Sequence, residues 1–188
     1  LEEYRPVPLP GKSTFLLIAR LLEDKGIREY ASAARKVRQT HPEARFLLVG
    51  WSDVNPRALR PAEVESGVHE GLIEFLGRLE DVRPAMARAD IFVLPSYREG
   101  TPRTVLEAMA MGRPIITTDV PGCRHTVEPG INGLLVPAGD ANRLAEAMAR
   151  LLDDPQLAGR MGRESQRMAR ERFDATSVAG TVLDAAGL

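Results

Sequence analysis

Two glutamates, Glu99 and Glu107, are the residues of this sequence best suited to bind a polar ligand. Glu107 is the only charged residue between Thr104 and Met111, in a segment that is otherwise apolar. Burying a carboxylate in such a segment is costly unless the carboxylate accepts hydrogen bonds. Hydroxyl groups of a ligand would donate them, so a ligand-binding role is predicted. The alternative is that Glu107 reaches solvent.

The residues between the two glutamates add a second kind of binding group. Residues 91–94 form an apolar run that predicts a buried strand, and residues 105–111 predict a buried helix. Thr101 is a good N-cap, and Pro102 suits the first helical position. The unpaired amides of the first turn, at residues 103–105, predict a site for an anion.

Two cations upstream are expected at the same edge of the sheet. Arg20 and Lys25 follow a predicted strand at residues 14–19, and ligands bind open α/β sheets at the carboxyl ends of the strands. Both could bind phosphate groups. With Gly100, which allows close approach of the backbone, these groups suit a ligand that carries hydroxyls and phosphate, such as a nucleotide sugar. The alternative is solvated loop charges beside an ordinary strand-to-helix turn.

Strands and helices alternate along the whole chain, which predicts an α/β fold: a doubly wound parallel sheet of about six strands with helices on both faces. Residues 50–71 form a long polar loop, in which Trp51 either flanks a base or covers the core. Strands are predicted at residues 14–19, 45–49, 72–76, 91–94, 114–118 and 133–136, and helices at 26–39, 81–88, 105–111, 140–152, 155–172 and 174–188.

Composition excludes several classes of protein. A net charge of -1 argues against nucleic-acid binding by bulk electrostatics. No apolar run is long enough to span a bilayer. The single cysteine, Cys123, excludes an internal disulfide and fits a reducing compartment, so we expect a cytoplasmic protein. The 188 residues start with Leu1 rather than methionine, and we expect part of a longer protein.

Motifs of other enzyme classes are absent from the sequence. The three histidines are dispersed, and neither Asp-x-Asp, Gly-x-Ser-x-Gly nor Gly-x-Gly-x-x-Gly occurs. Residues 11–14 (GKST) resemble the end of a phosphate-binding P-loop, but Pro6 stands where its first glycine belongs and a strand follows instead of a helix. These absences disfavour hydrolase, dehydrogenase and P-loop functions.

The sequence resembles the carboxyl-terminal half of retaining glycosyltransferases with the GT-B fold, of the group 1 or family 4 type. Sucrose, glycogen and bacterial surface-polysaccharide transferases belong to that family. The resemblance implies a Rossmann-like half of a GT-B fold. Its core is the pair Glu99 and Glu107, the second of which lies in the pattern P-x-x-x-x-E-A-M-A-x-G-x-P. It is carried by residues 18–37, 45–50, 73–82, 89–127, 130–140 and 144–155.

The resemblance also implies roles for individual residues. Arg20 and Lys25 would hold the diphosphate of the donor, backbone amides near Thr104 and Val105 its distal phosphate, and Glu107 the ribose. Glu99, with the backbone of the next two residues, would bind the donor sugar. The implied catalytic residues are Glu99, Arg20 and Lys25, and the implied donor-binding residues are Glu107, Gly100, Thr101, Pro102, Arg103, Thr104, Val105, Gly77, Arg78, Leu79, Gly50 and Trp51.

By the same resemblance, the whole protein would be a retaining, metal-independent transferase without a cofactor. It would use a uridine diphosphate sugar, such as a UDP-N-acetylhexosamine, and a polysaccharide or lipid-linked acceptor at the inner face of the membrane. Residues 1–13 would lead in from an acceptor-binding domain, residues 14–173 would bind the donor, and the helix at 174–188 would pack on the absent domain.

One departure from the family pattern is His125, where relatives often have an acidic residue. An epimerase-like protein and a non-catalytic nucleotide-sugar-binding module are the alternatives.

Overall fold

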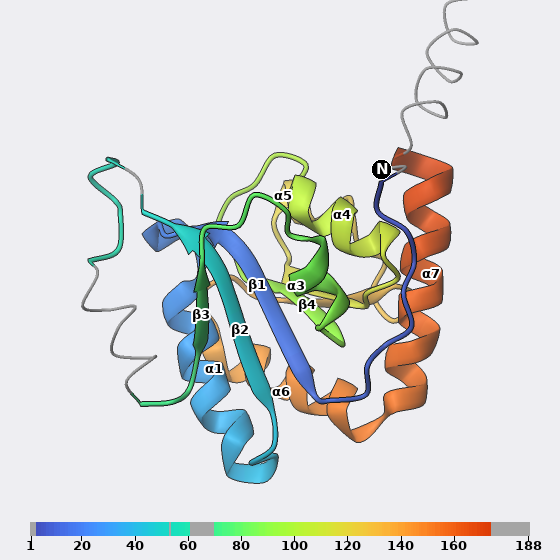
Figure 1. The fold of residues 1–188 in the computed structure, drawn as a ribbon, viewed down its shortest axis with the longest axis horizontal. Helices are drawn as coiled ribbons and strands as arrows, with labels where there is room; N and C mark the ends of the chain where they lie inside the picture. The colour runs from blue at the N-terminus through green and yellow to red at the C-terminus, as the bar shows by residue number, and fades with distance from the viewer. Residues whose placement is uncertain (1–2, 53, 61–69, 174–188) are drawn as a thin grey trace, which may run out of the picture.

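The computed structural model describes residues 3–52, 54–60 and 70–173 of the chain. Their elements alternate between strand and helix, as the sequence predicts (Figure 1). In chain order they are β1 (Thr14–Arg20), the 3-10 helix η1 (Glu23–Lys25), α1 (Ile27–Thr40), β2 (Arg45–Trp51), β3 (Glu74–Gly77), α3 (Arg83–Ala87), β4 (Ile91–Leu94), α4 (Arg103–Ala110), β5 (Ile115–Thr118), α5 (Pro121–Arg124), β6 (Gly133–Val136), α6 (Ala141–Asp153) and α7 (Pro155–Phe173).

The six strands form one parallel sheet in the order β3-β2-β1-β4-β5-β6. This is the strand order of a Rossmann-like doubly wound sheet, so the predicted fold class is confirmed. The chain builds outward from β1 in one direction, to β2 and β3, and then returns to β4 and builds in the other. The topological switch point therefore lies between β1 and β4.

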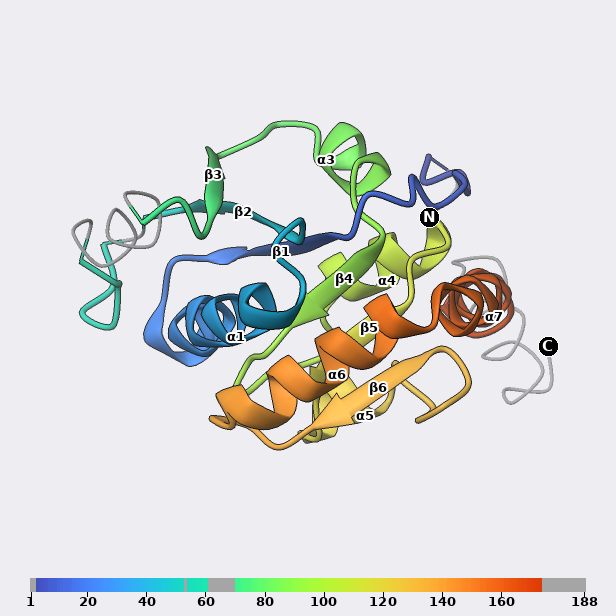
Figure 2. The ribbon, with the colours of Figure 1, turned by 90° about the horizontal axis from the view of Figure 1, so that it is seen from below.

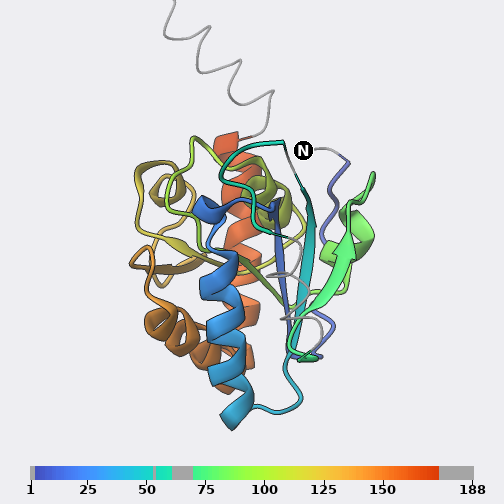
Figure 3. The ribbon, with the colours of Figure 1, turned by 90° about the vertical axis from the view of Figure 1, so that its left-hand side faces the viewer.

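Helices cover both faces of this sheet (Figures 2 and 3). On one face α1 packs against α6, and elsewhere α4 packs against α7. This division follows from the topology, because right-handed crossovers on the two sides of the switch point place their helices on opposite faces. A strand that is covered on both faces has a continuous run of apolar residues. Strand β4 is an example, since all four of its residues are buried.

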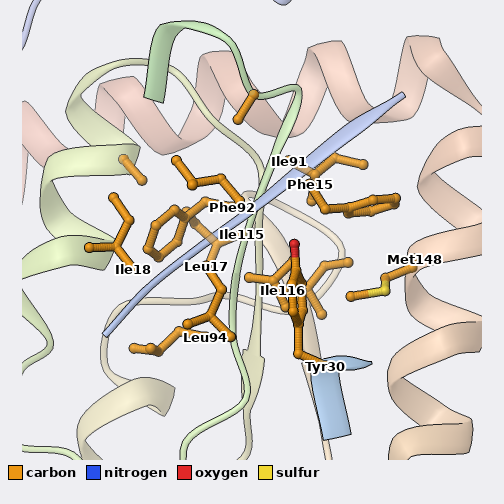
Figure 4. Close-up of a cluster of buried hydrophobic side chains, with 14 of the residues drawn as sticks. Phe15, Leu17, Ile18, Tyr30, Ile91, Phe92, Leu94, Ile115, Ile116 and Met148 are labelled. Carbon is orange, nitrogen blue, oxygen red and sulfur yellow. The ribbon is translucent and has the colours of Figure 1, made fainter. Parts of the chain in front are cut away.

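The core lies between these helices and the sheet, and Figure 4 shows part of it. The rings of Phe15 and Phe46, on neighbouring strands, stack with centroids 5.1 Å apart. Tyr30 of α1 is fully buried and its hydroxyl donates to the Leu47 carbonyl at 3.1 Å. Burial raises the pKa of this phenol well above its ordinary value, so Tyr30 acts as a neutral core residue.

The segment before β1 is extended and runs alongside α7 (Figure 1). A buried arginine, Arg113, holds it in place: its guanidinium donates to the carbonyls of Val7, Pro8, Met111 and Ala89. Burial lowers the pKa of Arg113 to about 10, which still leaves the side chain charged at neutral pH. The guanidinium therefore satisfies carbonyls that no secondary structure pairs.

Asp90 holds the next part of the same segment. This aspartate, which is buried at the start of β4, accepts hydrogen bonds from the backbone amides of Gly11, Lys12 and Thr14 at 2.6, 2.9 and 3.0 Å. Three amide donors compensate a carboxylate charge well. Arg113 and Asp90 together attach residues 7–14 to the domain, so the predicted leading segment has a defined path.

The structure departs from the predicted elements in a few places. Strand β3 is shifted towards the carboxyl terminus relative to the predicted 72–76, and η1 and α5 were not predicted. Neither helix exceeds four residues, which is too short for a helical period to appear in the sequence. The predicted helix at 174–188 and part of the loop at 50–71 lie outside the described residues. None of the helices that are described is long and apolar enough to cross a membrane.

Substituting Arg113 by methionine keeps most of the side-chain volume, but removes the guanidinium donor of the buried Ala89 carbonyl and the hydrogen bonds that hold Val7 and Pro8. We expect the free energy of unfolding to fall by about 3 kcal/mol, because each unsatisfied buried group costs roughly 1–3 kcal/mol. Urea denaturation measures this change. The control is Arg167→Met on the exposed face of α7, which should change stability by less than about 0.5 kcal/mol. Equal effects of the two substitutions would contradict the anchoring role of Arg113.

Candidate ligand site at the carboxyl edge of the sheet

Most of the predicted site residues gather where the chain leaves β1 and β4. These strands are neighbours, with Phe15 opposite Ile91 and Leu16 opposite Phe92. Their carboxyl ends therefore open at the same edge of the sheet. The space outside this edge, the crevice, is where an open α/β sheet binds its ligand.

Lys25 and Glu99 meet in this crevice. The Lys25 ammonium lies 2.7 Å from the Glu99 Oε1, and the two side chains are only 14% and 15% exposed. Seventy-four positions separate them in sequence, so only the strand order brings them together. An ion pair this shielded from water interacts more strongly than one on the surface, but each charge depends on the other for compensation.

A close backbone contact fixes the distance between the two loops. Gly26 follows Lys25 with a left-handed backbone (φ 69°), and a Cβ at this position would lie 2.1 Å from the Pro95 carbonyl oxygen. Only glycine fits this contact. The Tyr97 amide then donates to the Asp24 carbonyl at 2.8 Å. These contacts hold the loop after β4 against the loop after β1.

Helix α4 begins at Arg103, with Pro102 in the N-cap position and in an extended conformation. The predicted capping by Thr101 is therefore wrong, and no side chain caps this helix. The Val105 amide donates to the Pro102 carbonyl at 3.0 Å. Within the described structure the amides of Arg103 and Thr104 have no acceptor, so this helix start could hold an anion.

Glu107 lies one turn further along α4 and is 5% exposed, so the alternative that it reaches solvent is wrong. Its Oε1 accepts a hydrogen bond from the Arg103 Nε at 2.9 Å, while Arg103 itself stays largely exposed. Tyr4, from the leading segment, was not predicted here. Burial, the charge of Glu107 and a side-chain hydrogen bond with this carboxylate raise the pKa of the Tyr4 phenol to about 12.

A second cluster forms at the ends of β2 and β3. The Arg78 guanidinium lies 5.8 Å from the centroid of the Trp51 ring, in a cation–π contact. Trp51 is 38% exposed and so is not simply part of the core. Arg20 is opposite Trp51 in the strand register and, like it, is exposed. The structure thus places Arg20 beside Trp51, at the end of β1.

The remaining predicted residues have plain structural environments. Gly50 allows β2 to approach β1, because a Cβ there would lie 2.6 Å from the Ala19 carbonyl oxygen. Gly77 ends β3 with a left-handed backbone (φ 68°) and open space beside it. Leu79 packs on the core. His125 is exposed at the end of α5. Their binding roles stay predictions.

Two buried polar atoms beside the crevice were not predicted. The Ser96 hydroxyl follows β4 and the Asp24 Oδ1 precedes Lys25, and both lack a hydrogen-bond partner in the described structure. Such orphaned groups are uncommon and costly, and water or a ligand usually satisfies them. No sequence signal distinguishes them, since serine and aspartate are ordinary loop residues. Among the described residues, no three His, Cys, Asp or Glu side chains gather in a metal-binding arrangement.

Comparisons with known proteins identify the family of this chain. A match to the family of group 1 glycosyl transferases covers residues 12–154. The chain is 35% identical over 154 residues to the Campylobacter jejuni N,N'-diacetylbacillosaminyl-diphospho-undecaprenol alpha-1,3-N-acetylgalactosaminyltransferase. The alignment covers 82% of this chain and 39% of the relative. This chain thus spans well under half the length of that relative.

Solved structures share the fold over nearly the whole chain. Sucrose-phosphate synthase from Thermosynechococcus elongatus superposes with a TM-score of 0.82 at 31% identity, over 98% of this chain and 49% of that one. The Anabaena protein HepE, in complex with UDP, superposes with a TM-score of 0.83 over 95% of this chain and 50% of that one. At 23% identity the second likeness supports the fold alone.

The Lys25–Glu99 pair can be tested by a double-mutant cycle in which Lys25→Met and Glu99→Gln are made singly and together. Each single change leaves a shielded polar group without its partner, so we expect the two effects on the free energy of unfolding to be non-additive by on the order of 1–2 kcal/mol. Urea denaturation of the four proteins gives the coupling. The exposed pair Arg143–Glu146 serves as control and should couple by less than about 0.5 kcal/mol. A Lys25–Glu99 coupling no larger than this would show that the pair does not form in solution.

Proposed function

The chain belongs to the group 1 glycosyltransferase family, and from this premise we propose that it is the donor-binding half of a retaining glycosyltransferase. The whole protein would transfer a sugar from a nucleotide diphosphate sugar to a polysaccharide or lipid-linked acceptor. The observation that carries the proposal is the convergence of Lys25, Glu99, the start of α4 and Glu107 at the switch point. Cations, free amides and a buried carboxylate are the groups that a nucleotide sugar requires.

Each part of the donor would then meet a group of matching chemistry. The diphosphate lies between Lys25 and the amides of Arg103 and Thr104, with Arg20 nearby. The ribose hydroxyls donate to the Glu107 carboxylate, which is buried and already oriented by Arg103. The base lies towards residues 77–79 and Trp51, on whose exposed ring Arg78 rests. Glu99, with the backbone of the following residues, accepts hydroxyls of the sugar.

The Lys25–Glu99 ion pair suggests how donor binding prepares the reaction. In the structure Lys25 neutralises Glu99. A diphosphate carries more negative charge than a carboxylate and would attract the ammonium away from Glu99. The freed carboxylate would then accept hydrogen bonds from the sugar. Binding of the two ends of the donor would thus be coupled through one side chain.

The reaction breaks the bond between the anomeric carbon and a diphosphate oxygen, and forms a bond from that carbon to an acceptor hydroxyl oxygen, which loses its proton. Negative charge grows on the leaving diphosphate as its bond breaks. Fixed cations and helix amides would stabilise this charge in place, because they require no reorganisation during the reaction. We propose that Lys25, Arg20 and the start of α4 do so without a divalent metal.

The acceptor and the rest of the protein are proposals of the same kind. The chain covers 39% of the Campylobacter relative, so we propose an additional domain that binds the acceptor. That relative is named for transferring N-acetylgalactosamine to an undecaprenol-linked sugar. A UDP-N-acetylhexosamine donor and a lipid-linked acceptor, met at the cytoplasmic face of a membrane through the additional domain, are consistent with this relationship.

Glu107→Ala should weaken nucleotide binding by about 100-fold or more, because two hydrogen bonds from ribose to a buried carboxylate are lost. The fold should survive, since Arg103 is exposed and Tyr4 is only half-buried, so both partners of Glu107 can turn to water. Isothermal titration calorimetry with UDP measures the affinity, and circular dichroism checks the fold. Glu146→Ala is the matched control: its carboxylate also pairs with an arginine on a helix, but on the exposed face of α6. Unchanged affinity in Glu107→Ala would refute the ribose-binding role.

Titration of the chain with UDP, GDP and ADP in excess chelator tests the donor and the metal together. We expect UDP to bind most tightly and added magnesium to leave its affinity within about twofold, because Lys25 and the helix amides already compensate the diphosphate. Preference for GDP or ADP would transfer the proposal to another nucleotide sugar. A large gain in affinity with magnesium would contradict metal-independent binding.

A further inference from the structure

The loop that carries Glu99 rests against a glycine of α5. A Cβ on Gly122 would lie 1.7 Å from the Gly100 carbonyl oxygen and 2.2 Å from the Glu99 carbonyl oxygen. Real side chains never approach a backbone atom so closely. Gly122 is part of a helix and does not adopt the left-handed backbone that favours glycine. Its lack of a side chain therefore serves the contact and not the backbone conformation.

The other side of the same loop is open. A Cβ on Gly100 would have no atom within 4 Å, so this side of the backbone faces free space. Gly122 packs against the carbonyl groups of Glu99 and Gly100, so the position of α5 determines where this part of the backbone lies.

Helix α5 is itself firmly seated on β5. Cys123 is fully buried where α5 packs against β5, and burial raises the pKa of its thiol. The hydroxyl of Thr118, on β5, donates to the Ser96 carbonyl. These contacts connect α5, β5 and the loop after β4 without a gap. A helix held in this way can act as a rigid support.

The loop is thus fixed at both ends by glycines. Gly26 contacts Pro95 at its beginning, and Gly122 contacts the Glu99–Gly100 backbone at its end. Glu99 lies between these contacts, and its carboxylate pairs with the Lys25 ammonium. A shift at either contact would move this carboxylate.

We propose that Gly122 is a positioning residue, which sets the distance between the Glu99 carboxylate and the sugar of the bound donor. The proposal rests on the proposed function, because it assumes that Glu99 accepts hydroxyls of this sugar. It makes a distinct claim: a residue outside the Glu99–Glu107 motif, from a different crossover, controls recognition of the sugar. Recognition of the nucleotide should not depend on it, since the three atoms nearest to a Cβ on Gly122 belong to Glu99 and Gly100 and not to α4.

The test compares two affinities of the 188-residue chain, one for UDP and one for a UDP-sugar. The UDP-sugar is whichever of UDP-glucose, UDP-N-acetylglucosamine and UDP-N-acetylgalactosamine the wild type binds most tightly. Gly122→Ala should push the loop forward and remove most of the additional affinity that the sugar supplies, on the order of tenfold for a lost hydrogen bond to a charged group. Affinity for UDP alone should stay within about threefold. Calorimetry measures both.

Gly133→Ala is the matched control. A Cβ there would lie 2.2 Å from the Ile115 carbonyl oxygen, a clash of similar severity between β5 and β6. It should lower the thermal midpoint as Gly122→Ala does, but leave the ratio of the two affinities unchanged. Loss of the sugar contribution in both variants, or in neither, would overturn the positioning role.

A second variant covers the case in which Gly122→Ala does not fold. Cys123→Ala removes the thiol that seats α5 without adding an atom to the contact, and should reduce the sugar contribution partially. An unchanged ratio would overturn the proposal. A wild-type chain that binds no nucleotide would instead refute the proposed function. A wild-type chain that binds UDP as tightly as it binds each of the UDP-sugars would refute the role of Glu99, and with it that of Gly122.

Discussion

The parallel pairing of β1 with β4 joins two segments that are some seventy residues apart in the chain, and the site exists because of it. Phe15 and Leu16 lie opposite Ile91 and Phe92, and the strands are buried on both faces. Their carboxyl ends are then forced to the same edge, where Lys25 meets Glu99 at 2.7 Å. If either strand were placed elsewhere in the sheet, the two charges would have no partner. Burial of the central strands thus provides the geometry that the chemistry needs.

The strand order sets the approximate position of the loops that carry the site, and backbone contacts then define their position more closely. Gly26 and Gly122 bring main chain against main chain at distances that no side chain allows. The contacts do not depend on flexible side chains, so they fix the loop after β4 within a fraction of an ångström. Asp90 and Arg113 do the same for the segment before β1, through hydrogen bonds to its amides and carbonyls. Tyr4 reaches Glu107 from this segment.

The charges of the site compensate one another. Lys25 pairs with Glu99, and Arg103 with Glu107. An unpaired charge in so shielded a place would destabilise the domain, so each pair lets a shielded carboxylate keep its charge. Under the proposed function, a ligand that carries both phosphate and hydroxyl groups would exchange partners with both pairs. A ligand with only one kind of group would leave a charge uncompensated.

The sequence by itself determined the fold class and the family, and it supplied the candidate binding groups. Its apolar runs and helical periods predict the strands and the longer helices, because burial leaves a local pattern. The isolated carboxylate of Glu107 among apolar residues indicated a buried polar site for the same reason. Only the tertiary structure decided which groups meet. The Lys25–Glu99 pair, the approach of Tyr4 to Glu107 and the contact of Gly122 with the Glu99 loop join distant segments, and no local pattern encodes them. The start of α4 was misplaced because the extended backbone at Pro102 depends on how the loop is held, not on the capping preference of Thr101. Local periodicity records burial within one element, whereas contacts between elements follow from the order in which the strands assemble.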